Sequence, residues 1–190
     1  MVTLNRIYTR TGDKGSTRLA TGEPVSKASL RVDAYGGVDE TNACIGLVRL
    51  HTDGELDAIL SRIQNDLFDL GADLATPDTG KDLGYEPLRI VDGQVERLER
   101  EIDQLNAELS PLNSFILPAG TPAAAHLHLA RTVCRRAERS LVALMAHDEK
   151  VSAAALKYLN RLSDLLFVAA RFANGKGADD VLWAPGGTRD

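Results

Sequence analysis

The sequence predicts an all-α protein, a bundle of five helices that follows an extended glycine loop. Apolar residues recur at alternating spacings of three and four along separate stretches, as expected for helices with one buried face. Seams with this mixed spacing are typical of helices that pack side by side in a bundle. A chain of 190 residues can bury a sizeable core, and we expect a single domain over residues 1–190.

Composition and charge argue against several classes of function. The net charge of −5 disfavours a general affinity for nucleic acid, although a local basic site for a small anion remains possible. No apolar run approaches the roughly 20 residues that cross a bilayer, and the first residues lack a signal-peptide core. Cys44 and Cys134 form no C-x-x-C pair and are expected to be buried free thiols. We therefore expect a cytoplasmic protein without nucleic-acid or membrane partners.

Residues 1–28 contain the glycine loop, which runs from Ile7 to Leu19 as I-Y-T-R-T-G-D-K-G-S-T-R-L. Glycine lets backbone amides turn inward, hydroxyls donate hydrogen bonds and cations offset charge, so the loop is a candidate cradle for an anion. Lys27 is a further cation that could fold back onto the same anion or equally lie in solvent. The loop matches neither a Walker A motif nor a dinucleotide fingerprint. A glycine-rich surface turn is the alternative interpretation.

Two helices are expected after this loop. The first begins at about Val38, after a break at Gly36-Gly37, with Asp39 in its first turn. Its apolar residues are Ala43, Leu47 and Leu50. Asp53 is the candidate N-cap of a long second helix. The buried residues of that helix are expected to be Leu56, Leu60, Ile63, Leu67, Leu70 and Leu74.

A loop and a third helix come next. The prolines and glycines from Thr76 to Pro87 predict an exposed loop, and Asp92 then starts a helix. The apolar residues of this helix are Val95, Leu98, Ile102, Leu105 and Leu109. Two prolines between Ser110 and Gly120 predict an extended crossing instead of a continued helix.

Two more helices complete the bundle. Thr121-Pro122 is a capping hydroxyl followed by proline in the first turn, and the fourth helix runs from there to about Met145. Ser152 caps a fifth helix, which ends at about Gly175. The bundle is therefore expected over residues 38–175, with an irregular tail at 176–190.

The fourth helix carries a cluster of arginines, R-T-V-C-R-R-A-E-R from Arg131 to Arg139. At about 100° per residue, one side of the helix presents Arg131, Arg135, Glu138 and Arg139. Guanidinium groups on one stripe repel each other unless an anion lies among them, and their planar fork suits carboxylate or phosphate oxygens. A solvated helix face with ordinary ion pairs is the alternative interpretation.

The sequence shows no convincing set of side-chain nucleophiles or metal ligands. His126 and His128 are two residues apart on one helix and face different ways, so we expect no metal-binding set. A chain rich in arginine and loop donors but poor in nucleophiles favours catalysis by positioning and electrostatics around reactive ligands.

Five motifs in order resemble one known family. They are T-R-T-G-D-K-G-S-T-R-L from Thr9, V-D-A-Y-G-G-V-D-E-T-N from Val32, F-I-L-P from Phe115, R-T-V-C-R-R-A-E-R from Arg131 and Y-L-N-R-L-S-D-L-L-F from Tyr158. Together they closely resemble the PduO-type ATP:cob(I)alamin adenosyltransferases, from Ile7 to about Arg171. The resemblance implies a ferritin-like, up-and-down five-helix bundle that assembles as a homotrimer, with active sites between neighbouring subunits.

The resemblance also implies roles for individual residues. The ATP-binding residues would be Thr9, Arg10, Thr11, Gly12, Thr17, Arg18, Lys27, Arg135, Glu138, Arg139 and Asn160. Arg131 resembles the arginine that pairs with an aspartate across the subunit interface, and Asp39 is the position that matches this partner. Phe115 resembles the aromatic residue that packs beneath the corrin ring in place of the lower axial base. We expect Arg135, Phe115, Asp39 and Arg131 to be the residues on which catalysis depends.

The implied reaction needs no protein nucleophile. Co(I) would attack the 5′ carbon of ATP and expel triphosphate, while Arg135, Arg18 and Lys27 with a Mg²⁺ ion offset the growing charge. A reductase and an adenosylcobalamin-dependent client enzyme are possible partners. The alternative is a non-catalytic ATP sensor or adenosylcobalamin carrier. A phosphotransferase is disfavoured because no catalytic aspartate lies in a kinase or P-loop setting.

Overall fold

The computed structural model describes residues 7–80, 82–147 and 150–189. The first six residues of the expected anion-binding segment lie outside these ranges. Within them, the helices are α1 (Leu30–Arg49), α2 (Gly54–Ala75), α3 (Asp92–Asn106), α4 (Pro122–Met145) and α5 (Ala153–Ala173). Two short strands, β1 (Ser16–Arg18) and β2 (Pro24–Ser26), form an antiparallel hairpin in which Thr17 lies opposite Val25. The predicted five-helix, all-α architecture is confirmed.

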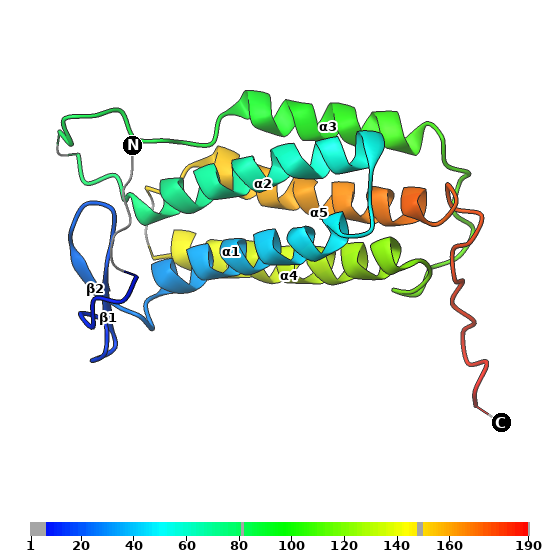
Figure 1. Cartoon of the computed structure of the whole chain (residues 1–190), viewed down its shortest axis with the longest axis horizontal. Helices are drawn as coiled ribbons and strands as arrows, with labels where there is room; N and C mark the ends of the chain where they lie inside the picture. The colour runs from blue at the N-terminus through cyan, green and yellow to red at the C-terminus, as the bar shows by residue number, and fades with distance from the viewer. Residues whose placement is uncertain (1–6, 81, 148–149, 190) are drawn as a thin grey trace.

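The helices lie side by side along one axis. α1 packs against α4 and α2, and α5 packs against α4 and α3. Figure 1 shows α1 and α4 on one face of the bundle and α3 on the opposite face, with α2 and α5 between them. The hairpin lies at the end where α1 begins, and the C-terminal tail leaves from the other end. No helix in the described parts of the chain is long and apolar enough to span a membrane.

The seams predicted for the second and third helices lie in the core, apart from Ile102 and Leu109, which are only partly buried. All six apolar residues predicted for α2 are buried, as are Val95, Leu98 and Leu105 of α3. Thr121 and Ser152 cap α4 and α5, because their hydroxyl oxygens accept hydrogen bonds from the amides of Ala124 and Ala155. Asp53 is the N-cap residue of α2, but its side chain makes no capping hydrogen bond.

The first helix differs from the prediction. It begins at Leu30, with the Ser29 hydroxyl accepting from the Val32 amide at 3.4 Å, and it passes through Gly36-Gly37 without a break. Glycine weakens a helix by about 1 kcal/mol per residue, so two glycines in a row predict a helix boundary. Packing overrides that cost, since a Cβ on Gly37 would lie 3.1 Å from the Cα of Ala137 in α4. The bundle therefore starts before the predicted residue 38.

The buried face of α1 was also predicted wrongly. The predicted apolar residues Ala43, Leu47 and Leu50 are exposed. The face that packs against α4 and α2 instead carries Ala34, Val38, Ile45 and Val48. The buried face is set by the earlier start of the helix: its apolar seam begins at Ala34, one turn after Leu30.

Candidate functional site

The glycine loop and the hairpin enclose a hollow of about 590 Å³. All seven residues predicted in this segment line it: Thr9, Arg10, Thr11, Gly12, Thr17, Arg18 and Lys27. Lys27 does fold back onto the loop, because a Cβ on Gly12 would lie 3.0 Å from its Nζ atom. The structure therefore brings hydroxyls and cations together around one concave surface.

Local hydrogen bonds set the shape of the loop. Gly15 has a φ of 81°, a conformation that favours glycine, and its carbonyl accepts from the Lys27 amide at 2.9 Å. The hydroxyls of Thr9 and Thr11 lie 2.9 Å apart, and Arg18 Nη1 donates to the Gly22 carbonyl at 2.7 Å. These contacts hold the polar groups of the loop in place before any ligand arrives.

The hairpin is fixed to the end of the bundle. Leu19 is buried, and the amide of Ala20 donates to the carbonyl of Ala75 in α2 at 3.0 Å. Arg31, in the first turn of α1, donates from Nη1 to the Leu74 carbonyl at 2.7 Å. The hollow therefore has a defined position relative to the helices.

The polar stripe of α4 meets α5 at Asn160. Asn160 Nδ2 donates to Glu138 Oε1 at 2.9 Å, and Asn160 Oδ1 accepts from Arg161 at 2.7 Å. Arg139 Nη1 donates to the Arg135 carbonyl at 3.0 Å, while the Arg135 side chain is exposed. The predicted group Arg135, Glu138, Arg139 and Asn160 thus lies across two neighbouring helices.

Arg131 is less exposed than Arg135 and Arg139, the other arginines of the stripe. Burial, and then repulsion from Arg135, lower the pKa of Arg131. Among the described residues, its Nε atom has no hydrogen-bond partner. Asp39 is exposed on α1 and forms no ion pair with Arg131 in the described parts of the chain. The pairing of these two residues across a subunit interface stays a prediction.

Phe115 lines a second hollow, of about 690 Å³. Its side chain is 77% exposed, and the ring of Trp183 meets it edge-on with the centroids 6.0 Å apart. Phe167 and Arg131 also line this hollow, so its aromatic part borders the arginine stripe. Trp183 was not predicted from the sequence, because an isolated aromatic residue in an irregular tail carries no periodic signal.

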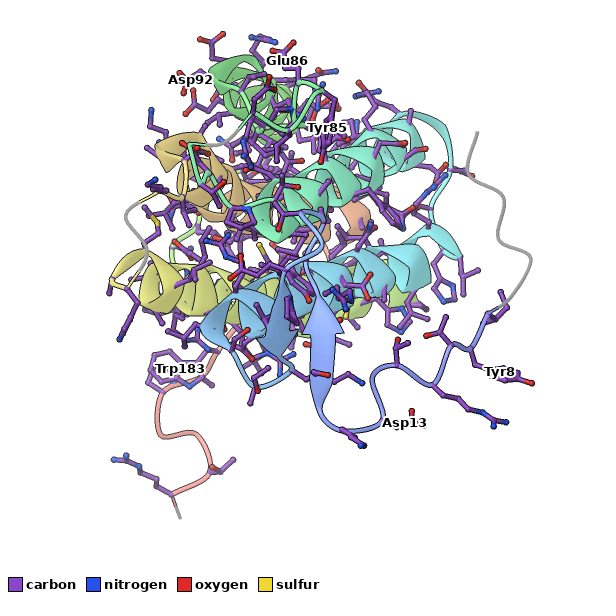
Figure 2. The ribbon with its side chains drawn as sticks, turned by 90° about the vertical axis from the view of Figure 1, so that its left-hand side faces the viewer. Tyr8, Asp13, Tyr85, Glu86, Asp92 and Trp183 are labelled. Carbon is purple, nitrogen blue, oxygen red and sulfur yellow. The ribbon has the colours of Figure 1, made fainter. Side chains whose placement is uncertain are left out.

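The two hollows are far apart in one chain. Figure 1 shows the hairpin at one end of the bundle and the segment after α5 at the other. Figure 2, which looks along the bundle, shows Asp13 and Trp183 both on the side of α1 and α4. Two ligands bound in the two hollows of one chain would therefore lie apart. They could meet only if the hollows came from two copies of the chain.

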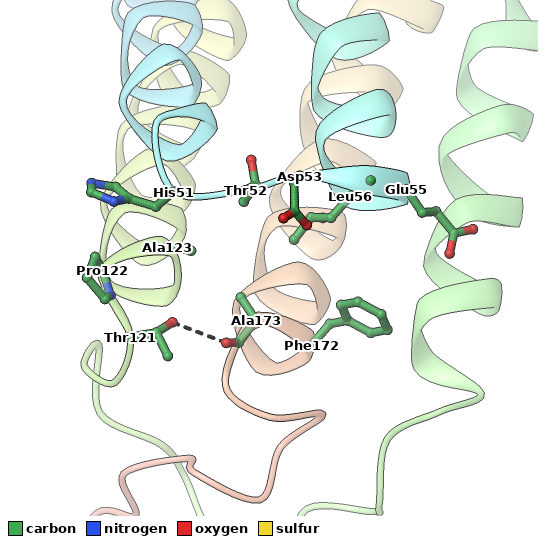
Figure 3. Close-up of a pocket in the computed structure, with 11 residues that line it drawn as sticks. His51, Thr52, Asp53, Glu55, Leu56, Thr121, Pro122, Ala123, Phe172 and Ala173 are labelled. Atoms are coloured by element: carbon green, nitrogen blue, oxygen red, sulfur yellow. Dashed lines mark hydrogen bonds between the residues drawn. The ribbon is translucent and has the colours of Figure 1, made fainter.

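A third hollow, of about 530 Å³, lies where α2 and α4 begin (Figure 3). Its lining includes His51, Asp53 and Phe172, and none of the predicted site residues. The His51 ring stacks on that of His126 with the centroids 5.3 Å apart. In the described part of the chain, no group of three or more His, Cys, Asp or Glu residues is placed to hold a metal ion.

Burial raises the pKa of both cysteine thiols. Both are free; Cys134 is fully buried and Cys44 only partly, so burial is confirmed for one of them. Burial raises the pKa of the Cys134 thiol well above its ordinary value, and the Sγ atom donates to the Leu159 carbonyl at 3.3 Å. Because the thiolate is the reactive form, the burial of Cys134 makes it unsuited to act as a nucleophile.

The chain is similar to proteins of one family over nearly its whole length. A family model described as cobalamin adenosyltransferase matches residues 7–173. The corrinoid adenosyltransferase of Mycobacterium tuberculosis is 53% identical over 191 residues, which cover 99% of this chain and 97% of the relative. The corrinoid adenosyltransferase of Bacillus subtilis is 46% identical over 182 residues, covering 93% and 91%.

A solved structure has the same fold. It is a variant of the PduO-type ATP:corrinoid adenosyltransferase from Lactobacillus reuteri, complexed with cobalamin and ATP. It superposes with a TM-score of 0.85 at 39% sequence identity, and the match covers 94% of this chain and 99% of that chain. The similarity therefore extends to the arrangement of the helices.

Proposed function

This chain belongs to the cobalamin adenosyltransferase family, and on that premise we propose that it transfers the 5′-deoxyadenosyl group of ATP to cob(I)alamin. The products are adenosylcobalamin and triphosphate. The observation that supports this most directly is the presence of two hollows with different linings. One is polar and lined with cations and hydroxyls, and the other is aromatic and bordered by an arginine.

The polar hollow is suited to the triphosphate of ATP. The hydroxyls of Thr9, Thr11 and Thr17 donate hydrogen bonds to phosphate oxygens, and Arg10, Arg18 and Lys27 offset their charge. Arg135, Glu138, Arg139 and Asn160 contact the nucleotide from the bundle side. Mg²⁺ arrives on the triphosphate, since this ion prefers phosphate oxygens and water to a cage of protein ligands.

The aromatic hollow is suited to the corrin ring. Phe115 occupies the lower face of the ring and withholds the axial ligand, which makes Co(II) easier to reduce because an electron-donating group is removed. Co(I) is then the nucleophile, so the buried thiol of Cys134 has no part in the reaction. The protein contributes by holding the two reactants in line and by stabilising the leaving triphosphate.

A homotrimer brings the two hollows together. Because the glycine loop and the segment between α3 and α4 lie at opposite ends of the bundle, the loop of one subunit meets the aromatic hollow of the next. Asp39 and Arg131 pair across this contact, which supplies the half-buried guanidinium of Arg131 with a counter-charge. Free thiols fit the reducing cytoplasm, where a reductase and an adenosylcobalamin-dependent client enzyme are the expected partners.

An anaerobic assay tests this function. The purified protein is mixed with ATP, Mg²⁺ and chemically reduced cobalamin, and the corrinoid spectrum and the released phosphates are followed. Adenosylcobalamin formed together with intact triphosphate is the expected result. Tight ATP binding without adenosylation would favour a sensor or carrier, and release of ADP would mean that the reaction is a phosphoryl transfer.

A further inference from the structure

The chain after α5 folds back along the segment that carries Phe115. Ile116 and Leu182 form an isolated antiparallel bridge. The amide of Leu117 donates to the Val181 carbonyl at 2.7 Å, and the amide of Trp183 donates to the Phe115 carbonyl at 2.8 Å. Residues 181–183, which we call the tail strand, therefore fix the backbone of Phe115 directly.

One buried arginine holds the tail strand and the Phe115 segment to the bundle. Arg171 of α5 donates from Nε to Asp180 Oδ2 at 2.8 Å and from Nη2 to the Ser110 carbonyl at 2.9 Å. The Arg171 and Asp180 side chains are only 7% and 3% exposed. A single guanidinium thus connects the start of the Phe115 segment with the residue just before the tail strand.

A buried asparagine holds the other end of the same segment. Asn174 Oδ1 accepts from the Thr121 amide at 2.9 Å, and Nδ2 donates to the Ala119 carbonyl at 3.2 Å and to Asp180 Oδ1 at 3.3 Å. The Thr121 hydroxyl in turn donates to the Ala173 carbonyl at 3.1 Å (Figure 3). We call Arg171, Asn174 and Asp180 the tail clamp.

The backbone around the clamp is shaped to fit it. Gly120 has a φ of 110°, and a Cβ there would overlap the amide group of Asn174. Gly177 has a φ of 87°, and a Cβ there would lie 3.0 Å from Arg171 Nη2. Both positions favour glycine by conformation and by space. A buried ion pair is weak evidence for stability alone, because desolvation offsets most of its Coulomb energy.

We propose that Arg171 and Asp180 are positioning residues for the corrinoid. Given the proposed function, Arg171 and Asp180 hold Phe115 and Trp183 as two walls of the corrin site without touching either substrate. The glycine loop lies at the end of the bundle opposite to the tail strand. Loosening the clamp therefore impairs the use of the corrinoid and leaves ATP binding intact.

The test uses a nearly isosteric change and a matched control. Asp180→Asn keeps the shape of the side chain but removes the charge that holds Arg171. The control is Lys176→Met, which breaks the neighbouring but exposed ion pair between Lys176 and Glu108. Trp183 is the single tryptophan of the sequence, so its fluorescence reports on the tail strand alone. For each full-length protein, Trp183 emission, ATP affinity, and kcat/KM for reduced cobalamin are measured.

The expected result is specific to the corrinoid. In Asp180→Asn, kcat/KM for cobalamin falls by about 10²-fold, because displaced walls no longer hold the ring in line. Trp183 emission shifts to the red, while ATP affinity stays within about twofold and Lys176→Met matches the unmodified protein. An unchanged cobalamin kcat/KM with unchanged emission would overturn the inference, as would an equal loss of ATP and cobalamin binding.

Two further results keep the test decisive. If Asp180→Asn does not fold, Arg171→Lys answers the same question by the same measurements, since lysine keeps the positive charge but lacks the fork that reaches Ser110. An unmodified protein that binds ATP but forms no adenosylcobalamin would refute the proposed function, and Trp183 emission in the variants would still report whether the clamp holds the tail strand.

Discussion

At the scale of single residues, the arginines of α4 differ in what surrounds them. Arg131 is half-buried beside the aromatic hollow, and burial lowers its pKa. Arg136 pairs with Glu40 of α1 on another face of the helix. Arg135 is exposed, and none of the ion pairs among the described residues includes it. Its guanidinium is therefore available for a charge-assisted contact with a phosphate.

Arg135→Ala removes that contact. We expect a loss of at least about 2 kcal/mol of transition-state stabilisation, because a hydrogen bond between charged groups disappears. The measurement is kcat/KM for ATP. Arg100→Ala is the control, since Arg100 is an exposed arginine of α3 with only a weak pair to Glu96 at 3.9 Å. An unchanged kcat/KM in Arg135→Ala would exclude the phosphate role.

Phe115→Ala tests the second hollow. Adenosylation should slow markedly while ATP affinity remains nearly the same, because the aromatic wall contributes to corrin geometry and not to nucleotide binding. Phe68→Ala is a matched control: Phe68 is 73% exposed on α2, close to the 77% of Phe115. If ATP binding were lost in Phe115→Ala, this residue would belong to the nucleotide site instead.

At the scale of elements, the close contact of α1 with α4 depends on Gly37. A Cβ at this position would lie 3.1 Å from both Cα and Cβ of Ala137. The backbone of a packed helix cannot move aside as a flexible side chain can. Gly37 therefore sets the distance between the two helices that carry Asp39 and the arginine stripe.

Gly37→Ala should destabilise the bundle in spite of alanine's better helix propensity. We expect a net loss of about 1 kcal/mol, since overpacking outweighs the propensity gain. Gly71→Ala is the comparison, because a Cβ at Gly71 of α2 meets nothing within 4 Å. That variant should be up to about 1 kcal/mol more stable. Urea unfolding of both proteins measures the difference, and equal stabilisation by the two changes would contradict the close contact.

At the scale of the whole molecule, the two hollows of the proposed site lie at opposite ends of the helical bundle. The polar hollow lies beside the start of α1, and the aromatic hollow lies beside the end of α5. If the proposed homotrimer joins the two hollows, activity depends on the association of subunits and should fall at protein concentrations at which subunits dissociate.

Asp39→Asn tests this dependence. We expect a weaker trimer together with lower activity, because Arg131 would face a neutral partner at a partly buried contact. Sedimentation velocity measures the assembly, and turnover is measured at the same protein concentration. Asp103→Asn, at an exposed position of α3, is the control. An intact trimer with full turnover in Asp39→Asn would count against the pairing.

The sequence by itself determined four of the five helices and predicted the residues that line the polar hollow. Capping residues such as Thr121 and Ser152 act locally, and the apolar seams of α2 and α3 indicate burial through their period, so both are predictable without a structure. The loop residues that line the polar hollow are close in sequence, apart from Lys27, and for that reason they were found together.

Only the tertiary structure decided the start of α1, the position of the tail beside Phe115 and the separation of the two hollows. Gly36-Gly37 continues a helix because a neighbouring helix needs the space at Gly37. Trp183 reaches Phe115 because Arg171, Asn174 and Asp180 turn the chain back over a segment about 60 residues earlier. These features depend on contacts between distant residues, and such contacts leave no periodic pattern in the sequence.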